Sequence, residues 1–107
     1  MKSKLEFTVT AEVDLREIVM YITEQTKDKS IALNFLKNIR EKCLVLEDFP
    51  EIGTIPKDRV LVGSDFRFIV FKEFLIFYKY DKMKNTVYIH AVIHSKRDYM
   101  RVMRKYL

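Results

Sequence analysis

The sequence has few residues that break or cross-link a chain: two glycines, two prolines and one cysteine among 107 residues. So little glycine and proline argues against disorder and for a compact fold with short connections. The lone Cys43 excludes an internal disulfide and a thiolate metal cluster, and its place in a helical apolar pattern predicts a core position. Because the length supports one hydrophobic core, we expect a single domain over residues 1–107.

Long hydrophobic runs and the most specific functional motifs are also missing. No apolar run approaches the length that crosses a membrane, and no signal peptide is recognisable, so we expect a cytoplasmic protein without membrane contact. A glycine-rich phosphate loop, the zinc-protease helix signature and the Gly-x-Ser-x-Gly nucleophile motif are absent. These absences argue against hydrolase and nucleotide-cofactor classes, and we expect no cofactor.

The chain is basic, with a formal net charge of +5. A basic surface favours polyanions or acidic proteins as partners, because opposite charges attract over several ångströms. In a small domain the same charge also provides solubility. The net charge therefore leaves both interpretations open.

Three strand-like runs dominate the second half of the chain. Residues 65–71 and 74–80 are rich in aromatic and β-branched side chains, and residues 86–95 alternate between apolar and polar side chains. The first two runs present apolar side chains on both faces, but one helical layer covers only one face of a sheet. The second face therefore needs the C-terminal tail, another element or a partner protein.

The first two runs are separated by only two residues, which predicts a tight hairpin. A two-residue turn places Phe71 opposite Phe74 and, in the same register, Arg67 opposite Tyr78. A strand start at residues 60–62, followed by a bend, is expected ahead of this hairpin.

Two helical patterns precede the strands. A weakly alternating run from Leu5 leads to Thr10, which we expect to cap the first helix. Apolar residues then recur at helical spacing, and after a polar break at residues 26–30 a second apolar stripe continues to Phe49 and Pro50. Two helices joined so closely should pair as an antiparallel hairpin that lies across the sheet.

A short amphipathic helix is predicted at the C-terminus. Ser95 and Asp98 have the spacing of a capping box, and apolar residues follow at helical intervals. The opposite face carries a basic stripe of Arg97, Arg101, Arg104 and Lys105. This stripe is either a solvated face or a contact surface for phosphates or an acidic partner.

Two histidines lie near the end of the last predicted strand. His90 and His94 are four residues apart, so we expect them on the same side of the strand. With no third ligand evident, we expect no metal site. His94 lies beside Lys96, Arg97 and Tyr99, where an acid or base could meet cations suited to a phosphodiester. The sequence favours a structural hydrogen bond to Asp98 or to the backbone over this catalytic interpretation.

Short sequence markers follow one another along nearly the whole chain. They are Asp14-Leu15 with Ile18 and Tyr21-Ile22, Phe49-Pro50-Glu51-Ile52-Gly53, Phe66-Arg67, Ile76-Phe77-Tyr78 and residues 92–98. With these markers in this order and at this spacing, the chain resembles the RelE/ParE superfamily of toxins from type II toxin–antitoxin systems. The resemblance implies an α+β fold: an N-terminal strand, an antiparallel helical hairpin on a twisted, mainly antiparallel sheet, and a short C-terminal amphipathic helix.

The superfamily contains two mechanisms, and this sequence resembles one branch more closely. RelE-like members are ribosome-dependent mRNA endonucleases that carry an arginine at the position of Leu75, and this chain lacks it. Arg67 and the His94-x-x-Arg97-Asp98 ending resemble ParE members, which inhibit DNA gyrase without cutting RNA. The resemblance implies a ParE-like gyrase inhibitor that forms a hetero-oligomer with a cognate antitoxin. The implied contact residues are Arg67, Arg97, Arg101, Arg104 and Lys105.

Two other functions stay open. Lys96 and Tyr99 permit an endoribonuclease that acts on ribosome-bound mRNA through Arg67, His94, Lys96 and Tyr99, provided that the four side chains converge. Arg67 also has a structural interpretation, in which it pairs with the Tyr78 hydroxyl or with an acid. The other possibility is a non-toxic binding module that only uses the fold.

Overall fold

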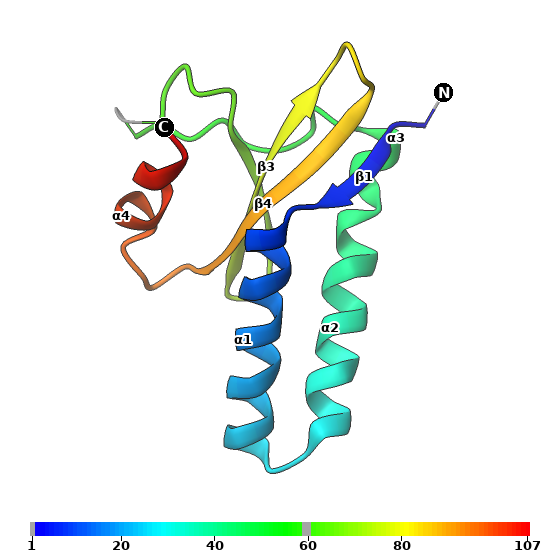
Figure 1. Cartoon of the computed structure of the whole chain (residues 1–107), viewed down its shortest axis with the longest axis vertical. Helices are drawn as coiled ribbons and strands as arrows, with labels where there is room; N and C mark the ends of the chain where they lie inside the picture. The colour runs from blue at the N-terminus through cyan, green and yellow to red at the C-terminus, as the bar shows by residue number, and fades with distance from the viewer. Residues whose placement is uncertain (1, 59–60) are drawn as a thin grey trace.

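A computed structural model describes residues 2–58 and 61–107 of the chain. Within them, a mixed sheet has the strand order β1-β4-β3-β2, and two long antiparallel helices lie side by side against one of its faces (Figure 1). The strands are β1 (Lys4–Phe7), β2 (Arg67–Phe71), β3 (Phe74–Asp81) and β4 (Thr86–His94). The helices are α1 (Val9–Thr26), α2 (Lys29–Cys43), α3 (Val45–Asp48) and α4 (Tyr99–Met103), with the 3₁₀ turn η1 (Arg104–Tyr106). The predicted α+β architecture is confirmed.

The helical hairpin forms as predicted, but α1 begins earlier. Thr8, not Thr10, is the N-cap, and its Oγ1 accepts a hydrogen bond from the backbone N–H of Ala11 at 3.2 Å. The Thr8 N–H still bonds to the carbonyl of Ile89 at 3.0 Å, so the chain leaves the sheet and enters the helix at a single residue. No helix in the described part of the chain is long and apolar enough to span a membrane.

The β2–β3 hairpin has the predicted register. Phe71 lies opposite Phe74 and Arg67 opposite Tyr78 in an antiparallel pair. The start of β2 differs from the prediction of a strand at residues 60–62. Residue 60 lies outside the described residues, and the following two form a turn, because the backbone N–H groups of residues 61 and 62 bond back to the Asp58 carbonyl.

β4 lies between β1 and β3 and carries one extra residue. Phe77 lies opposite Ala91, but the next residue of β3, Tyr78, lies opposite Ile89, so His90 has no partner on β3. An extra residue of this kind is a β-bulge, which shifts the alternation of side chains beyond it by one position.

The bulge places the two histidines on opposite faces of the sheet. His90 packs edge-on against Phe66 and Tyr106, with ring centroids 5.4 and 5.8 Å away. His94 packs edge-on against Phe74 at 5.3 Å, on the face that the long helices cover. The prediction that they share one side is wrong, because a four-residue spacing preserves the face only in a strand without a bulge.

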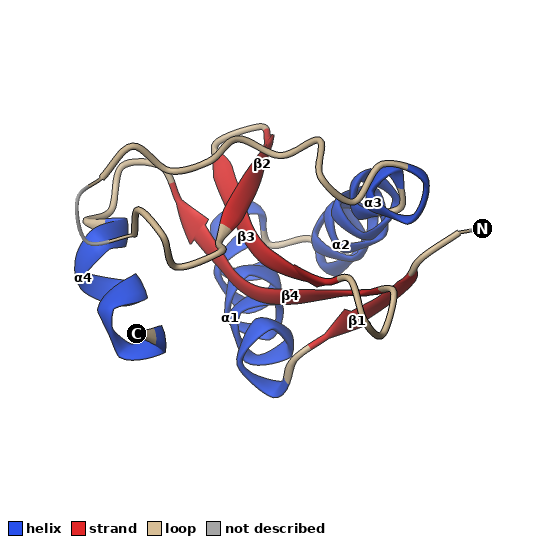
Figure 2. Cartoon of the chain, turned by 90° about the horizontal axis from the view of Figure 1, so that it is seen from above, coloured by secondary structure: helices blue, strands red, loops and turns tan. Residues whose placement is uncertain are grey.

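The second face of the sheet is covered by the C-terminal segment, defined as α4 and η1. Met103 is fully buried in a cluster that comprises Leu61, Phe66, Phe77, Ala91 and Ile93. Figure 2 shows α4 standing apart from α1 and α2. The predicted cap is wrong: Asp98 accepts the Arg101 N–H at 3.2 Å, while the N–H of Ser95 bonds to the Glu73 carbonyl at 2.8 Å and continues the sheet.

Candidate protein-interaction site

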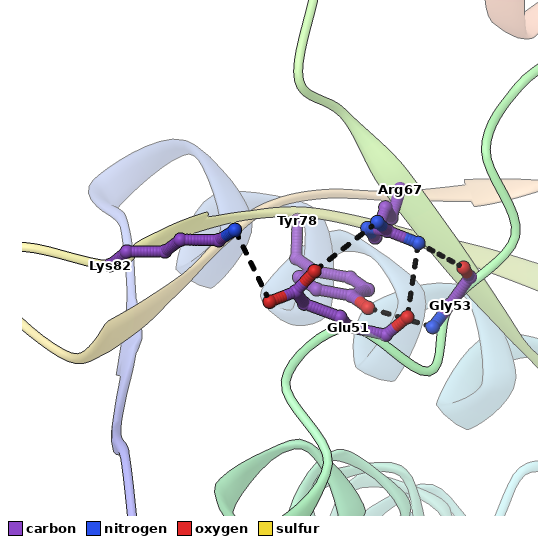
Figure 3. Close-up of polar contacts among 5 residues, drawn as sticks. All are labelled: Glu51, Gly53, Arg67, Tyr78 and Lys82. Atoms are coloured by element: carbon purple, nitrogen blue, oxygen red, sulfur yellow. Dashed lines mark hydrogen bonds and ion pairs between the residues drawn. The ribbon is translucent and has the colours of Figure 1, made fainter.

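Arg67 fastens the loop after α3 to the start of β2 (Figure 3). Its Nη1 donates to the backbone carbonyls of Glu51 at 3.0 Å and Gly53 at 3.1 Å, and its Nη2 lies 3.7 Å from the Glu51 carboxylate. Lys82 approaches the same carboxylate at 3.6 Å. Because its guanidinium holds two carbonyls and an acid of its own chain, Arg67 orders this loop, as the structural interpretation through an acid predicts.

Tyr78 completes this loop contact from beneath. It is fully buried, and its hydroxyl accepts the Gly53 N–H at 2.9 Å. Burial raises the pKa of Tyr78 above its usual value, so the phenol stays protonated. A side chain at Gly53 would begin 2.5 Å from the Tyr78 hydroxyl and 3.0 Å from the Phe68 carbonyl, so the approach requires glycine.

His94 is held by its own turn and a neighbouring strand end. Its Nδ1 accepts the backbone N–H of Lys96 at 3.1 Å, and its Nε2 lies 3.7 Å from the carboxylate of Glu73. An Nδ1 that accepts a hydrogen bond places the proton of the neutral ring on Nε2. One ring nitrogen of His94 is therefore occupied by its own turn, and the other faces the Glu73 carboxylate. The Lys96 side chain is exposed in the turn that follows.

The four residues of the nuclease alternative do not lie together. Arg67 lies opposite Tyr78 and His94 opposite Phe74, positions four residues apart on β3, which corresponds to about 13 Å of strand. Tyr99 packs on the second face of the sheet, away from His94. A catalytic set needs reacting groups within hydrogen-bond reach of one substrate position, and this placement does not provide it.

An open apolar groove lies between α1, α2 and the turn that joins β2 to β3. Its cavity volume is about 660 Å³. The apolar lining consists of Ile18, Tyr21, Ile22, Phe35, Phe74 and Val92. Tyr21 is 63% exposed, which is unusual for a large aromatic side chain on a helix that packs on a sheet. An exposed apolar hollow with charged side chains at its rim is typical of a protein-interaction site.

A second cavity, the charged hollow, separates α1 from the C-terminal segment. It has a volume of about 670 Å³. Three cations from the C-terminal end, Arg97, Arg101 and Lys105, line it together with three acids, Asp14 and Glu17 from α1 and Asp98 before α4. Across the described ranges, none of these three cations forms an ion pair within 4.0 Å. The fourth predicted cation of the stripe, Arg104, does not line the hollow.

Asp14 has a structural partner at the border of both cavities. Its Oδ2 accepts the backbone N–H of Val92 at 3.0 Å. Burial raises the pKa of Asp14, while this hydrogen bond and the nearby charges of Lys105 and Arg97 act in the opposite direction. The carboxylate is therefore committed to the edge of β4 and is only partly available to a cation.

Sequence reasoning assigned these cavity residues to other roles. Ile18 and Ile22 belong to the predicted core stripe of α1, yet they also form the wall of the apolar groove. In the sequence, Tyr21 is only one of the markers of the family resemblance. Tyr21 lies beside the apolar stripe of α1 and not within it, and this position is the feature of the sequence that indicates an exposed aromatic side chain.

The sequence matches one family over residues 5–99, described as the ParE toxin of the type II toxin–antitoxin system parDE. No curated protein sequence matches the chain. Among solved structures, the chromosomal ParDE toxin–antitoxin system from P. aeruginosa is similar, with a TM-score of 0.73, 16% identity and coverage of 89% of this chain and 98% of that chain.

Two further solved structures share the fold. The toxin–antitoxin complex RelBE2 from Mycobacterium tuberculosis has a TM-score of 0.63 at 20% identity, covering 88% of this chain and 92% of that chain. The isolated E. coli RelE toxin has a TM-score of 0.57 at 16% identity, covering 98% and 99%. At these identities, structural similarity establishes the fold alone, so the residues of this chain must carry the functional interpretation.

Proposed function

Because the chain belongs to the ParE family of type II toxin–antitoxin toxins, we propose that it inhibits DNA gyrase, or a related type II topoisomerase, by protein–protein contact in the cytoplasm. A cognate antitoxin neutralises it in a hetero-oligomer. The observation that carries this proposal is the engagement of Arg67, the candidate catalytic cation, in a loop contact with Glu51 and Gly53. Arg67 also borders a cavity of about 440 Å³, but there it lies beside Glu51, to which it is already bound. Two further cavities, the apolar groove and the charged hollow, lie away from Arg67.

The environment of Leu75 supports the same proposal. This residue lies opposite Ile93 and packs among the apolar side chains of the second sheet face. An arginine here, as the resemblance implies for the RelE-like nuclease branch, would place an unpaired charge against that apolar layer. The position therefore serves packing under the C-terminal segment.

The nuclease alternative demands chemistry that these residues do not assemble. Cutting a phosphodiester through a ribose hydroxyl needs a base and cations around one phosphate. Here the Nδ1 of His94 is occupied by the Lys96 N–H, and Arg67 lies near the other end of the hairpin. The proposed action is therefore binding and not cleavage.

A supercoiling assay tests the proposal. Purified chain in stoichiometric excess should block supercoiling by gyrase, and prior addition of the protein encoded by the adjacent reading frame should restore it. Unchanged supercoiling and unchanged DNA cleavage would contradict the proposal. In parallel, ribosome-bound mRNA in a translation reaction should remain intact. Cuts in the ribosomal A site, abolished by Arg67→Ala or His94→Ala, would support the endoribonuclease alternative, which the fold similarity to E. coli RelE makes worth testing.

A further inference from the structure

The turn between β3 and β4 projects beyond the rest of the sheet. β2 pairs with β3 only as far as Tyr78, so residues 79–81 of β3 continue past the end of β2. The last pair between β3 and β4 joins Asp81 to Thr86, and residues 82–85 form the turn beyond it. Figure 1 shows this turn at one end of the molecule's longest axis and the turn between α1 and α2 at the other.

Asn85 fixes the conformation of this turn. Its backbone lies in the left-handed region at φ 47°, and its side-chain oxygen accepts the Tyr80 hydroxyl at 2.8 Å. Its side-chain amide donates to the Lys2 carbonyl at 3.2 Å, and its own carbonyl accepts the Lys4 N–H at 2.9 Å. These bonds tie the turn to β3 and to β1, so little conformational freedom is left for a partner to restrict.

Met83 occupies the tip of this ordered turn. Its relative exposure is 96%, the highest value among the exposed large hydrophobic side chains of the described residues. So exposed a side chain contributes almost nothing to the core, but on a fixed backbone it can fill a pocket of a partner without a cost for ordering the turn. Methionine is enriched in protein interfaces, because its flexible thioether adapts to irregular apolar surfaces.

Two exposed lysines, Lys82 and Lys84, flank Met83. Two acids contact this turn. Asp81 accepts the Lys84 N–H at 3.1 Å, and the Glu51 carboxylate lies 3.6 Å from the Lys82 ammonium. Because the Lys82 side chain is 74% exposed, water weakens this ion pair and leaves the ammonium available to a partner. The tip therefore presents one apolar side chain between two cations.

The turn between α1 and α2 has the same two lysines around a different centre. Lys27 and Lys29 flank Asp28, whose carboxylate accepts the Ser30 N–H at 2.9 Å and caps α2. The central residue of that turn therefore stabilises a helix. The fold does not explain Met83 in the same way, because this side chain is almost fully exposed.

We propose that the β3–β4 turn inserts Met83 into an apolar pocket of the topoisomerase that has acidic side chains at its rim. Lys82 and Lys84 face those acids, which orients the turn and accelerates the encounter of the two proteins. A protein pocket fits better than a nucleic-acid backbone, because two lysines provide few phosphate contacts, whereas a buried anchor concentrates binding energy in protein interfaces. This inference rests on the proposed function, since it names the surface that contacts the target.

Substitution of Met83 tests the apolar anchor. The probe is purified DNA gyrase holoenzyme, and its binding to the full chain is followed by biolayer interferometry. Met83→Glu should weaken binding by roughly tenfold or more, mainly through faster dissociation, because it places a charge in an apolar pocket. Met83→Leu should retain the affinity. Met20→Glu is the matched control at a methionine that is 59% exposed on α1, and equal losses in both glutamate variants would overturn the anchor.

Neutralisation of the flanking lysines tests the acidic rim. Lys82→Gln combined with Lys84→Gln should slow association and reduce its salt dependence, because charges at the edge of an interface act mainly on the encounter. The same double replacement at Lys27 and Lys29 removes equal charge from the opposite end of the molecule and should change neither quantity. Equal effects at both ends would show that net charge alone matters, and would overturn the assignment.

Two further measurements identify other occupants of the turn. Binding of duplex DNA in the absence of gyrase, lost in the Lys82→Gln, Lys84→Gln protein, would assign the turn to phosphates and overturn the protein pocket. Binding of the protein encoded by the adjacent reading frame should be unchanged in Met83→Glu, because residues 82–84 line neither the apolar groove nor the charged hollow. Its loss from a folded variant would assign the turn to the antitoxin instead.

Supercoiling assays separate this inference from the proposed function. Inhibition by wild type together with weakened inhibition by Met83→Glu supports both. If wild type and Met83→Glu inhibit gyrase equally, the inference about the turn fails while the proposed function stands. If wild type neither binds nor inhibits gyrase, both fail.

Discussion

The carboxylate of Asp14 on α1 accepts the backbone N–H of Val92 on β4 at 3.0 Å. β1 leaves this part of the β4 edge unpaired, so the side chain of a helix closes an edge that another strand would otherwise cover. The same residue borders both the apolar groove and the charged hollow. One contact therefore links the completion of the sheet to the shape of the interaction surface.

Substitution of Asp14 separates hydrogen bonding from charge. Asp14→Ala leaves the Val92 N–H without its partner and should lower the free energy of unfolding by about 1–3 kcal/mol. Asp14→Asn retains a carbonyl acceptor and removes a charge that burial disfavours, so it should cost less than the alanine variant. Urea denaturation of both variants measures the difference. Equal losses would show that the charge, and not the hydrogen bond, matters.

The contacts of Arg67 with the loop after α3 should stabilise the folded protein. Arg67→Ala removes the contacts to the carbonyls of Glu51 and Gly53 and should lower the free energy of unfolding by about 1–3 kcal/mol. Tyr78→Phe removes one neutral hydrogen bond to the same loop and should cost about 1 kcal/mol. Denaturation gives both values.

A supercoiling assay on the folded Arg67→Ala protein completes this experiment. Inhibition of gyrase should persist at temperatures where circular dichroism shows the variant to be folded. A stable Arg67→Ala protein that has lost all inhibition would instead identify Arg67 as a direct contact with the target.

The C-terminal segment should stabilise the fold through Met103. This side chain is fully buried against the second sheet face, so Met103→Ala should destabilise the protein by about 2–5 kcal/mol. Met20→Ala, at an exposed site, should change stability by less than about 0.5 kcal/mol. Binding of a hydrophobic dye should increase for Met103→Ala, because the second face loses cover. A small effect at Met103 would mean that the segment is loosely attached.

His90 should make stability depend on pH. Burial, and then the nearby Lys79 ammonium, lower the pKa of His90 below its ordinary 6.5. As pH falls below 6.5, the unfolded chain takes up a proton that the folded chain refuses, so stability decreases until the lower folded pKa is passed. Tyr106 packs on the same ring from η1.

Melting curves at about pH 8 and about pH 5 measure this effect. Wild type should lose more stability between the two than His90→Gln, which cannot bind the proton. Parallel losses in the two proteins would assign the pH dependence to other groups.

Local patterns predicted the elements of this fold well. The two-residue gap between Phe71 and Phe74 determined the hairpin register, because strand pairing has a strict period of two. The predicted helix starts were wrong where residues near the start of a helix still form hydrogen bonds with the sheet. Thr10 has the chemistry of a cap, but α1 begins directly where the chain leaves the sheet, so Thr8 is the N-cap. Ser95 also has the chemistry of a cap, but its N–H is bonded to the Glu73 carbonyl, so α4 begins later and Asp98 is the N-cap.

The sequence by itself therefore determined the helices, the strands, the hairpin register and the family resemblance, all of which depend on residues close together in the chain. Only the tertiary structure decided that His90 and His94 face opposite sides, because a one-residue bulge leaves no mark in the alternation pattern. It likewise decided that Arg67 holds two loop carbonyls, sixteen and fourteen residues away in the sequence, and that α1 borders two cavities. Such contacts join distant segments, and their geometry depends on how the completed layers pack.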